Sequence, residues 1–112
     1  MQDLDVTPKM AKVLKIFLED PSKPRYGFEL MQLTGFASGS LYPMLAKFEG
    51  AGWLTGEKED IDSHAEGRPA RYTYTITGAA VTAARVQLAE LSDLYRPPTP
   101  IPARLRSQGS TS

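Results

Sequence analysis

The stretch from Ala37 to Leu54 carries the side chains best suited to chemistry in this 112-residue chain. Leu41, Leu45 and Phe48 are spaced at i, i+4 and i+7, which places them on one face of a helix. The opposite face is small, aromatic or cationic. Serine hydroxyls, a glycine that admits a close backbone approach and one lysine suit phosphate and base contacts. The residues of this face that we expect to contact nucleic acid are Ser38, Gly39, Ser40, Tyr42, Pro43 and Lys47.

The start and end of this helix follow from its small residues. Ser38 or Ser40 is expected to cap it, and Pro43 favours Ser40, because a missing proline N–H costs little in a first turn. Two glycines are expected to end the helix, which then spans about residues 38–52. On its own, the stretch fits an ordinary core helix with a polar outer face as well as it fits a helix that binds nucleic acid. The remainder of the sequence is needed to distinguish the two.

Composition excludes several classes of protein. The chain has no cysteine and one histidine, so no disulfide framework, thiolate site or histidine cluster is expected, and we predict no metal and no cofactor. The lone His64 lies in a polar loop, and no catalytic residues are predicted, so an enzyme is not expected. No apolar run is long enough for a membrane span, and the first residues do not resemble a signal peptide, so we expect a cytoplasmic protein without a membrane partner. A formal net charge of zero is evidence against a nucleic-acid binder, so few cations per subunit would have to perform any DNA binding.

Two helices are predicted ahead of Ala37. Residues 1–6 are expected to be frayed, and Thr7 followed by Pro8 is a typical helix start. The helix from there to residue 20 is apolar on more than one side, so it needs more than one neighbour. Residues 25–34 predict a second short helix that Gly35 ends. Two short helices joined by a glycine-containing turn are typical of a helix-turn-helix.

A β hairpin and a final helix are predicted after Leu54. Residues 54–59 and 71–76 suit paired strands, and the polar loop 60–70 would form a long tip, as in a winged helix. The helix 77–95 repeats apolar residues by threes and fours over two heptads, which we interpret as a dimer seam rather than as packing on its own core. The first helix also has an apolar face that needs a neighbour, and the predicted interface consists of Met10, Val13, Phe17, Val81, Ala84, Leu88, Leu91 and Tyr95.

The predicted fold is therefore mostly α with a small β hairpin (α+β). It consists of a winged helix-turn-helix over residues 7–76, a C-terminal dimerisation helix over 77–95, and a Pro-rich, mostly disordered tail over 96–112.

The wing and the second helix add candidate contacts to DNA. Gly67 and Arg68 would lie at the wing tip, where an arginine beside glycine suits insertion into a minor groove, and Arg71 follows on the return strand. Arg25 and Tyr26 are candidate phosphate clamps, although a buried Tyr26 ring is an equally good interpretation.

Four linked motifs within residues 25–77 resemble the PadR family of winged-helix transcriptional regulators. They are Y-G-F-E-L from Tyr26, S-G-S-L-Y-P from Ser38, the L-x-x-F-E-x-x-G-W-L pattern from Leu45, and G-R-P-A-R-Y-T-Y-T-I-T from Gly67. The short chain with one terminal helix is similar to the smaller branch of the family. The predicted wing contains more acids than bases, and this acidic charge weakens the prediction that the wing contacts DNA.

The resemblance implies a homodimer that binds palindromic promoter DNA, usually as a repressor. It implies that the last helix builds the dimer with the first helix of the partner, and that a small-molecule effector can release the DNA. We place a candidate effector pocket at Phe17, Trp53, Leu88 and Tyr95, with Trp53 alternatively a core residue. The alternative function is a dimeric winged-helix module that binds a ligand or a protein and no longer binds DNA.

Overall fold

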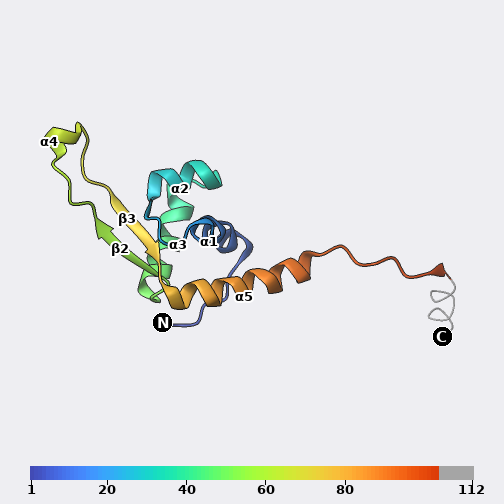
Figure 1. Cartoon of the computed structure of the whole chain (residues 1–112). Helices are drawn as coiled ribbons and strands as arrows, with labels where there is room; N and C mark the ends of the chain where they lie inside the picture. Colours follow the sequence, from blue (N-terminus) through green and yellow to red (C-terminus); the bar gives the residue numbers. More distant parts are fainter. Residues whose placement is uncertain (104–112) are drawn as a thin grey trace.

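The protein is described by a computed structural model over residues 1–103, and Figure 1 shows its arrangement. Three helices pack together, a hairpin extends from them on one side, and a long helix leaves on the other. In chain order the elements are α1 (Pro8–Glu19), β1 (Arg25–Tyr26), α2 (Gly27–Thr34), α3 (Ser38–Gly50), β2 (Leu54–Lys58), α4 (Ser63–Glu66), β3 (Tyr72–Ile76) and α5 (Gly78–Tyr95).

The sheet is antiparallel with strand order β1-β3-β2. Leu54 pairs with Ile76 at the base of the hairpin and Lys58 with Tyr72 near its far end, so the two predicted strands do pair. The strand β1 was not predicted, because Arg25 and Tyr26 were assigned to the second helix. They pair instead with Tyr74 and Thr73, and α2 begins only at Gly27.

The core lies where α1, α3 and the base of the hairpin meet. Phe17, Phe48 and Trp53 are its largest fully buried side chains, and the Phe48 and Trp53 rings lie 6.1 Å apart. The predicted apolar face of α3 is confirmed, because Leu41, Leu45 and Phe48 are each 0% exposed. The predicted fold class is also confirmed: the described chain is mostly helical, with a small antiparallel sheet in a winged helix-turn-helix arrangement.

The first six residues are held against the core rather than frayed, which corrects the sequence prediction. The Gln2 N–H donates to the carbonyl of Ala51 at 2.8 Å, and the Trp53 indole N–H donates to the Gln2 carbonyl at 2.7 Å. The side chain of Gln87 in α5 donates to the Leu4 carbonyl at 2.6 Å, and Val6 is buried. Unsatisfied backbone groups and one apolar side chain thus find partners that the local sequence does not reveal.

The helix α5 has two unlike halves. Thr77 caps its start, and Ala80 and Ala84 are fully buried against the core. Its distal half projects from the body in Figure 1, and Leu94 and Tyr95 are 72% and 66% exposed.

Half of the predicted dimer residues belong to the core of the single chain. Met10, Val13, Phe17 and Ala84 are at most 4% exposed, so they have no surface to offer a partner, and the prediction is corrected there. The apolar pattern of α1 and α5 arises because these two helices pack against each other within one chain. Val81, Leu88 and Leu91 are partly exposed and Tyr95 is exposed, so these four remain the proposed dimer residues.

Residues 97–102 have no regular secondary structure, and the remainder of the predicted tail, residues 104–112, lies outside the described residues. Within the part of the chain that the structure describes, no helix is both long and apolar enough to cross a membrane.

Candidate nucleic-acid interface

The outer face of α3 is a surface of small, aromatic and cationic side chains. All six residues predicted to contact nucleic acid from this helix are exposed, and Tyr42 keeps 44% of its surface accessible. The helix begins at Ser38, and its capping residue is Ala37, whose methyl group accepts no hydrogen bond. The predicted serine cap is therefore wrong, and both serines lie inside the first turn. Pro43 lies inside the helix, where it removes one N–H and leaves the carbonyl of Gly39 without its helical partner.

The Tyr42 side chain packs against a glycine of the neighbouring helix. A Cβ atom added to Gly27, the first residue of α2, would collide with the hydroxyl and ring atoms of Tyr42. The ring of Tyr42 thus lies directly on the start of α2, and a larger residue at position 27 would displace it. This packing joins α2 to α3 on the side of α3 that carries the predicted contacts.

A second contact joins α3 to the hairpin. The hydroxyl of Tyr72 donates to Glu49 Oε2 at 2.8 Å, and a Cβ at Gly56 would collide with both groups. The acceptor raises the pKa of Tyr72, because the neutral phenol donates the hydrogen bond. The carboxylate of Glu49 is thereby held on the flank of α3 next to the hairpin.

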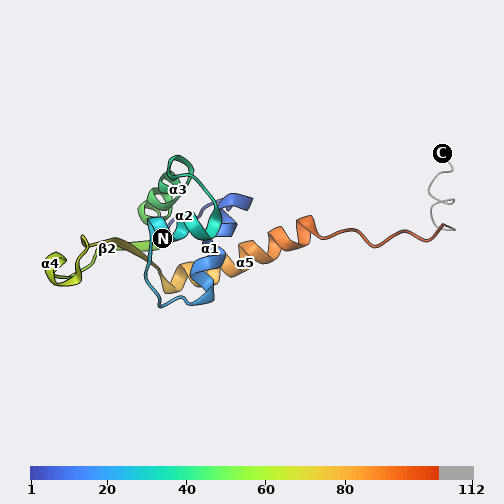
Figure 2. The ribbon, with the colours of Figure 1, turned by 90° about the horizontal axis from the view of Figure 1, so that it is seen from above.

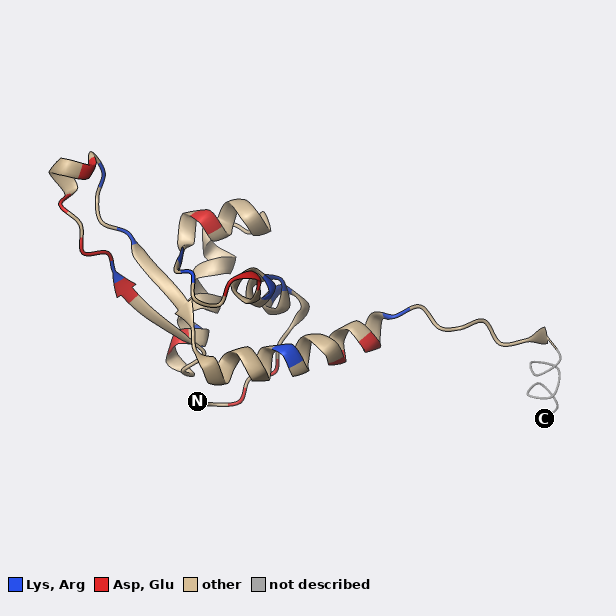
Figure 3. Ribbon diagram, viewed as in Figure 1, with Lys and Arg blue, Asp and Glu red and all other residues tan. Residues whose placement is uncertain are grey.

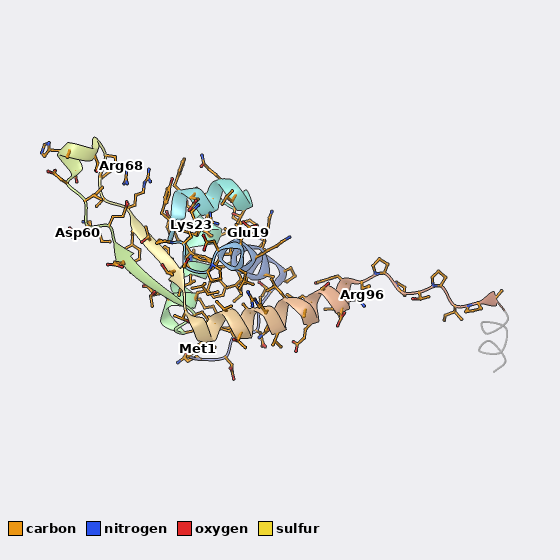
Figure 4. The ribbon with its side chains drawn as sticks, in the orientation of Figure 1. Met1, Glu19, Lys23, Asp60, Arg68 and Arg96 are labelled. Carbon is orange, nitrogen blue, oxygen red and sulfur yellow. The ribbon has the colours of Figure 1, made fainter. Side chains whose placement is uncertain are left out.

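The wing arginine is held by an acid of the same wing. Arg68 donates to Glu59 through both terminal nitrogens, at 2.8 and 3.1 Å, and the backbone N–H of Arg71 donates to the same carboxylate at 2.8 Å. The Arg68 guanidinium and the Arg71 N–H lower the pKa of Glu59 to about 2. The sequence did not reveal this pair, since Arg68 was expected at the wing tip as a contact to DNA. Figure 4 shows Arg68 and Asp60 on opposite limbs of the wing.

Arg25 and Tyr26, the predicted phosphate clamps, lie in different environments. The Arg71 guanidinium lies 4.2 Å from the centre of the Tyr26 ring, a cation–π contact that places both beside the hairpin. Arg25 is only 7% exposed and pairs with Glu29 at 3.2 Å and with Glu19 at 3.9 Å. Because it is buried and paired, its prediction as a phosphate clamp is corrected.

Acids predominate on the outgoing limb of the wing. Figure 3 shows acids along this limb and at the tip, with the basic Lys58 at the end of β2, and bases on the return limb. Gly67 follows α4 with a φ of 67°, a left-handed conformation that glycine adopts without strain, and it turns the chain into Arg68. The short helix α4, which the sequence did not predict, is capped by the Asp62 side chain.

An apolar groove lies between α1 and the distal half of α5. Its volume is about 310 Å³, and it is lined by Leu88, Leu91 and Tyr95 from α5 and by residues of α1 that include Lys12 and Lys15. Of the four predicted effector residues, Leu88 and Tyr95 line this groove. Phe17 and Trp53 are 0% and 1% exposed, so their prediction as ligand contacts is corrected.

The start of α1 is a cationic region that the sequence analysis missed. The Lys12 ammonium donates to the Thr34 carbonyl at 2.8 Å, and Lys9 and Lys12 lie 5.8 and 5.3 Å from the centre of the Phe36 ring. Both lysines fall between the apolar positions of α1, as solvated lysines do, so periodicity alone could not single them out. Among residues 1–103, no group of three His, Cys, Asp or Glu side chains could hold a metal ion.

A family model described as the PadR-like transcriptional regulator family matches residues 13–84, well over half of the chain. The chain belongs to this family. The match covers α2, α3 and the wing, where the four linked motifs lie. PadR-like proteins are transcriptional regulators rather than enzymes. No curated protein matches the chain.

Solved structures share the fold at low sequence identity. The structure of smu.1704 from Streptococcus mutans UA159 is 24% identical, with a TM-score of 0.60 over 81% of this chain and 84% of that one. A padr family transcriptional regulator from Eggerthella lenta DSM 2243 is 18% identical, with a TM-score of 0.60 over 93% and 87%. AbfR of Staphylococcus epidermidis is 17% identical, with a TM-score of 0.63 over 93% and 67%.

Proposed function

We propose that this PadR-like chain is a homodimeric repressor that binds palindromic promoter DNA, with α3 in the major groove and the wing near the minor groove. The observation that supports it most is the two-sided character of α3. One face is fully buried and fixes the helix to the core, while Ser38, Ser40 and Lys47 are exposed on the other. A rigid helix with a free hydroxyl and cationic face is what major-groove binding requires.

Dimerisation is proposed through the exposed side of α5. Val81, Leu88, Leu91 and Tyr95 form its partly or fully exposed apolar seam, and a second copy would shield it from water. Two copies of α3 would then enter successive major grooves about 34 Å apart. With about three or four phosphate contacts per subunit, the dimer would lose affinity with a salt slope near −6.

The groove between α1 and α5 is the proposed effector site. An apolar lining with two lysines suits a small aromatic molecule that carries a negative charge. Leu88, Leu91 and Tyr95 line this groove and also belong to the proposed dimer seam. A molecule bound there would therefore change the packing of the two subunits and the separation of the two α3 helices, and only one separation matches the DNA repeat.

The decisive experiment is a titration of the protein into a DNA fragment from its own upstream region at two salt concentrations. A repressor of the proposed kind binds tightly, loses affinity steeply with salt and prefers this fragment over a scrambled competitor. Weak and equal binding of both fragments would contradict sequence-specific binding.

A second candidate function is a dimeric winged-helix module that binds a ligand or protein instead of DNA. The pairing of Arg68 with Glu59 and the zero net charge favour it, because both reduce the positive charge offered to a duplex. The same titration separates the two functions, since this module binds neither fragment, while gel filtration would still show a dimer.

A further inference from the structure

The surface beside α3, opposite the wing, holds a cleft between α3 and the start of α1. Its volume is about 340 Å³, and its polar lining consists of Thr7 and Lys9 from α1 and Ser40 and Lys47 from α3. Pro43 and two methionines complete the lining, and no carboxylate from residues 1–103 contributes to it. Two ammonium groups and two hydroxyls from separate elements thus face one hollow.

The two lysines of this cleft are available to an external anion. Lys9 and Lys47 are both exposed. The ring of Phe36, in the turn between α2 and α3, lies beneath Lys9 and Lys12, and Lys12 already donates to the Thr34 carbonyl. The Phe36 ring favours a positive charge beside it, and the positive end of the α1 dipole favours an anion at this edge. At the start of α1, Pro8 has no N–H and the Met10 N–H donates to the Thr7 hydroxyl at 3.2 Å, so the anion would be held mainly by side chains.

The cleft lies where a DNA strand passes when α3 occupies a major groove. Figure 2 shows α3 with the wing on one side and the start of α1 on the other, and Figure 1 agrees. A helix in the major groove is flanked by a phosphate backbone on each side, because the groove is only about 12 Å wide. The wing side presents Tyr26 and Arg71, so the opposite side requires a cation of its own.

We infer that Lys9 of α1 and Lys47 of α3 form a phosphate clamp that holds the DNA backbone on the side of α3 away from the wing. Thr7 and Ser40 supply neutral hydrogen bonds to the same backbone. This inference rests on the proposed DNA binding and deepens it, by adding α1 to the elements that touch DNA. The clamp contacts phosphate only, so it contributes affinity in any sequence and sets the register of α3 without reading bases.

The test uses a mixed-sequence duplex of about 30 base pairs and the full chain. Lys9→Ala should lower the affinity about tenfold in a dimer and make the salt slope shallower by about 1.8, because two contacts of about 0.9 each are lost. Lys9→Arg should restore both quantities, since the charge returns. Lys23→Ala, which removes an exposed lysine outside the cleft, is the matched control and should leave the slope nearly unchanged.

The outcomes separate the clamp from the proposed function. A wild-type protein that binds the duplex, with Lys9→Ala and Lys47→Ala indistinguishable from Lys23→Ala, would overturn the clamp and leave DNA binding intact. A wild-type protein that fails to bind both this duplex and its own upstream DNA would overturn both. Circular dichroism of each variant shows whether the fold is retained, and Lys47→Ala carries the test if Lys9→Ala does not fold.

Discussion

The helix α3 and the wing each carry a cation among the proposed DNA contacts, and the two cations differ in their surroundings. Lys47 is exposed on a helix whose other face is fully buried, whereas both terminal nitrogens of Arg68 donate to Glu59 on a hairpin that extends away from the core. In the proposed DNA complex α3 would present Lys47 directly, while Arg68 would have to exchange the Glu59 carboxylate for a phosphate. Stability and DNA affinity should therefore respond differently to changes in the two regions.

The largest contrast is expected in stability. Leu45→Ala should lower the free energy of unfolding by about 2–5 kcal/mol, because it leaves a cavity beneath α3. Arg68→Ala should change it by less than about 1 kcal/mol, because its ion pair lies on a partly exposed hairpin. Urea denaturation of both variants measures the contrast. Equal losses would show that the wing is as firmly built into the core as α3.

The contact between Gly27 and Tyr42 allows a test of how α3 is held against α2. Alanine normally stabilises a helix relative to glycine by about 1 kcal/mol, yet Gly27→Ala should destabilise by about 1–3 kcal/mol, because its methyl collides with the Tyr42 ring. Gly39→Ala, at a position with open space around it, is the matched control and should not destabilise. In a Tyr42→Ala background most of the cost of Gly27→Ala should vanish, and an additive double mutant would refute the contact.

The wing pair predicts changes of opposite sign in DNA affinity. Arg68→Ala should weaken binding, by about 1–3 kcal/mol if the arginine reaches bases. Glu59→Gln should strengthen it by about 1 kcal/mol, since the guanidinium is released and one negative charge near the duplex disappears. Fluorescence anisotropy with labelled promoter DNA measures both. If Glu59→Gln weakens binding as much as Arg68→Ala, the acid positions the arginine instead of restraining it.

The smallest effect is expected from pH. The pKa of Glu59 lies at about 2 in the folded protein and about 4.3 when unperturbed. A lowered pKa means that the pair contributes its full stability above the unfolded value and loses it progressively as pH falls from there through about 2. Between pH 6 and 8 the affinity ratio of Glu59→Gln to wild type should therefore stay constant. Carbon NMR of the Glu59 carboxyl should show its midpoint near 2, and a midpoint near 4 would indicate an open pair.

The outer face of α3 could be predicted because periodicity alone separates its two sides. Leu41, Leu45 and Phe48 are buried, so the residues between them must face outward. The hairpin was predictable from two alternating runs of similar length. The linked motifs across residues 25–77 indicated the family of these elements from the sequence alone.

Tertiary pairings could not be predicted in this way. Arg25 is followed by a helix, where a charged residue is usually exposed, and its burial depends on the pairing of β1 with β3 and on the approach of Glu19 from the end of α1. The sequence gives no hint that Glu59 is the partner of Arg68, because a polar loop of variable path separates them. Lys9 likewise becomes notable only once α1 lies beside α3.

The hydrogen bond from the Trp53 indole to the Gln2 carbonyl has a practical consequence, because Trp53 is the only tryptophan of the chain. Its fluorescence comes from one place, where the first residues cross the end of α3 and the start of β2. Release of this segment would expose the indole and shift its emission to longer wavelength. The protein therefore contains its own optical reporter for events at the base of α3, and no added label is needed to follow them.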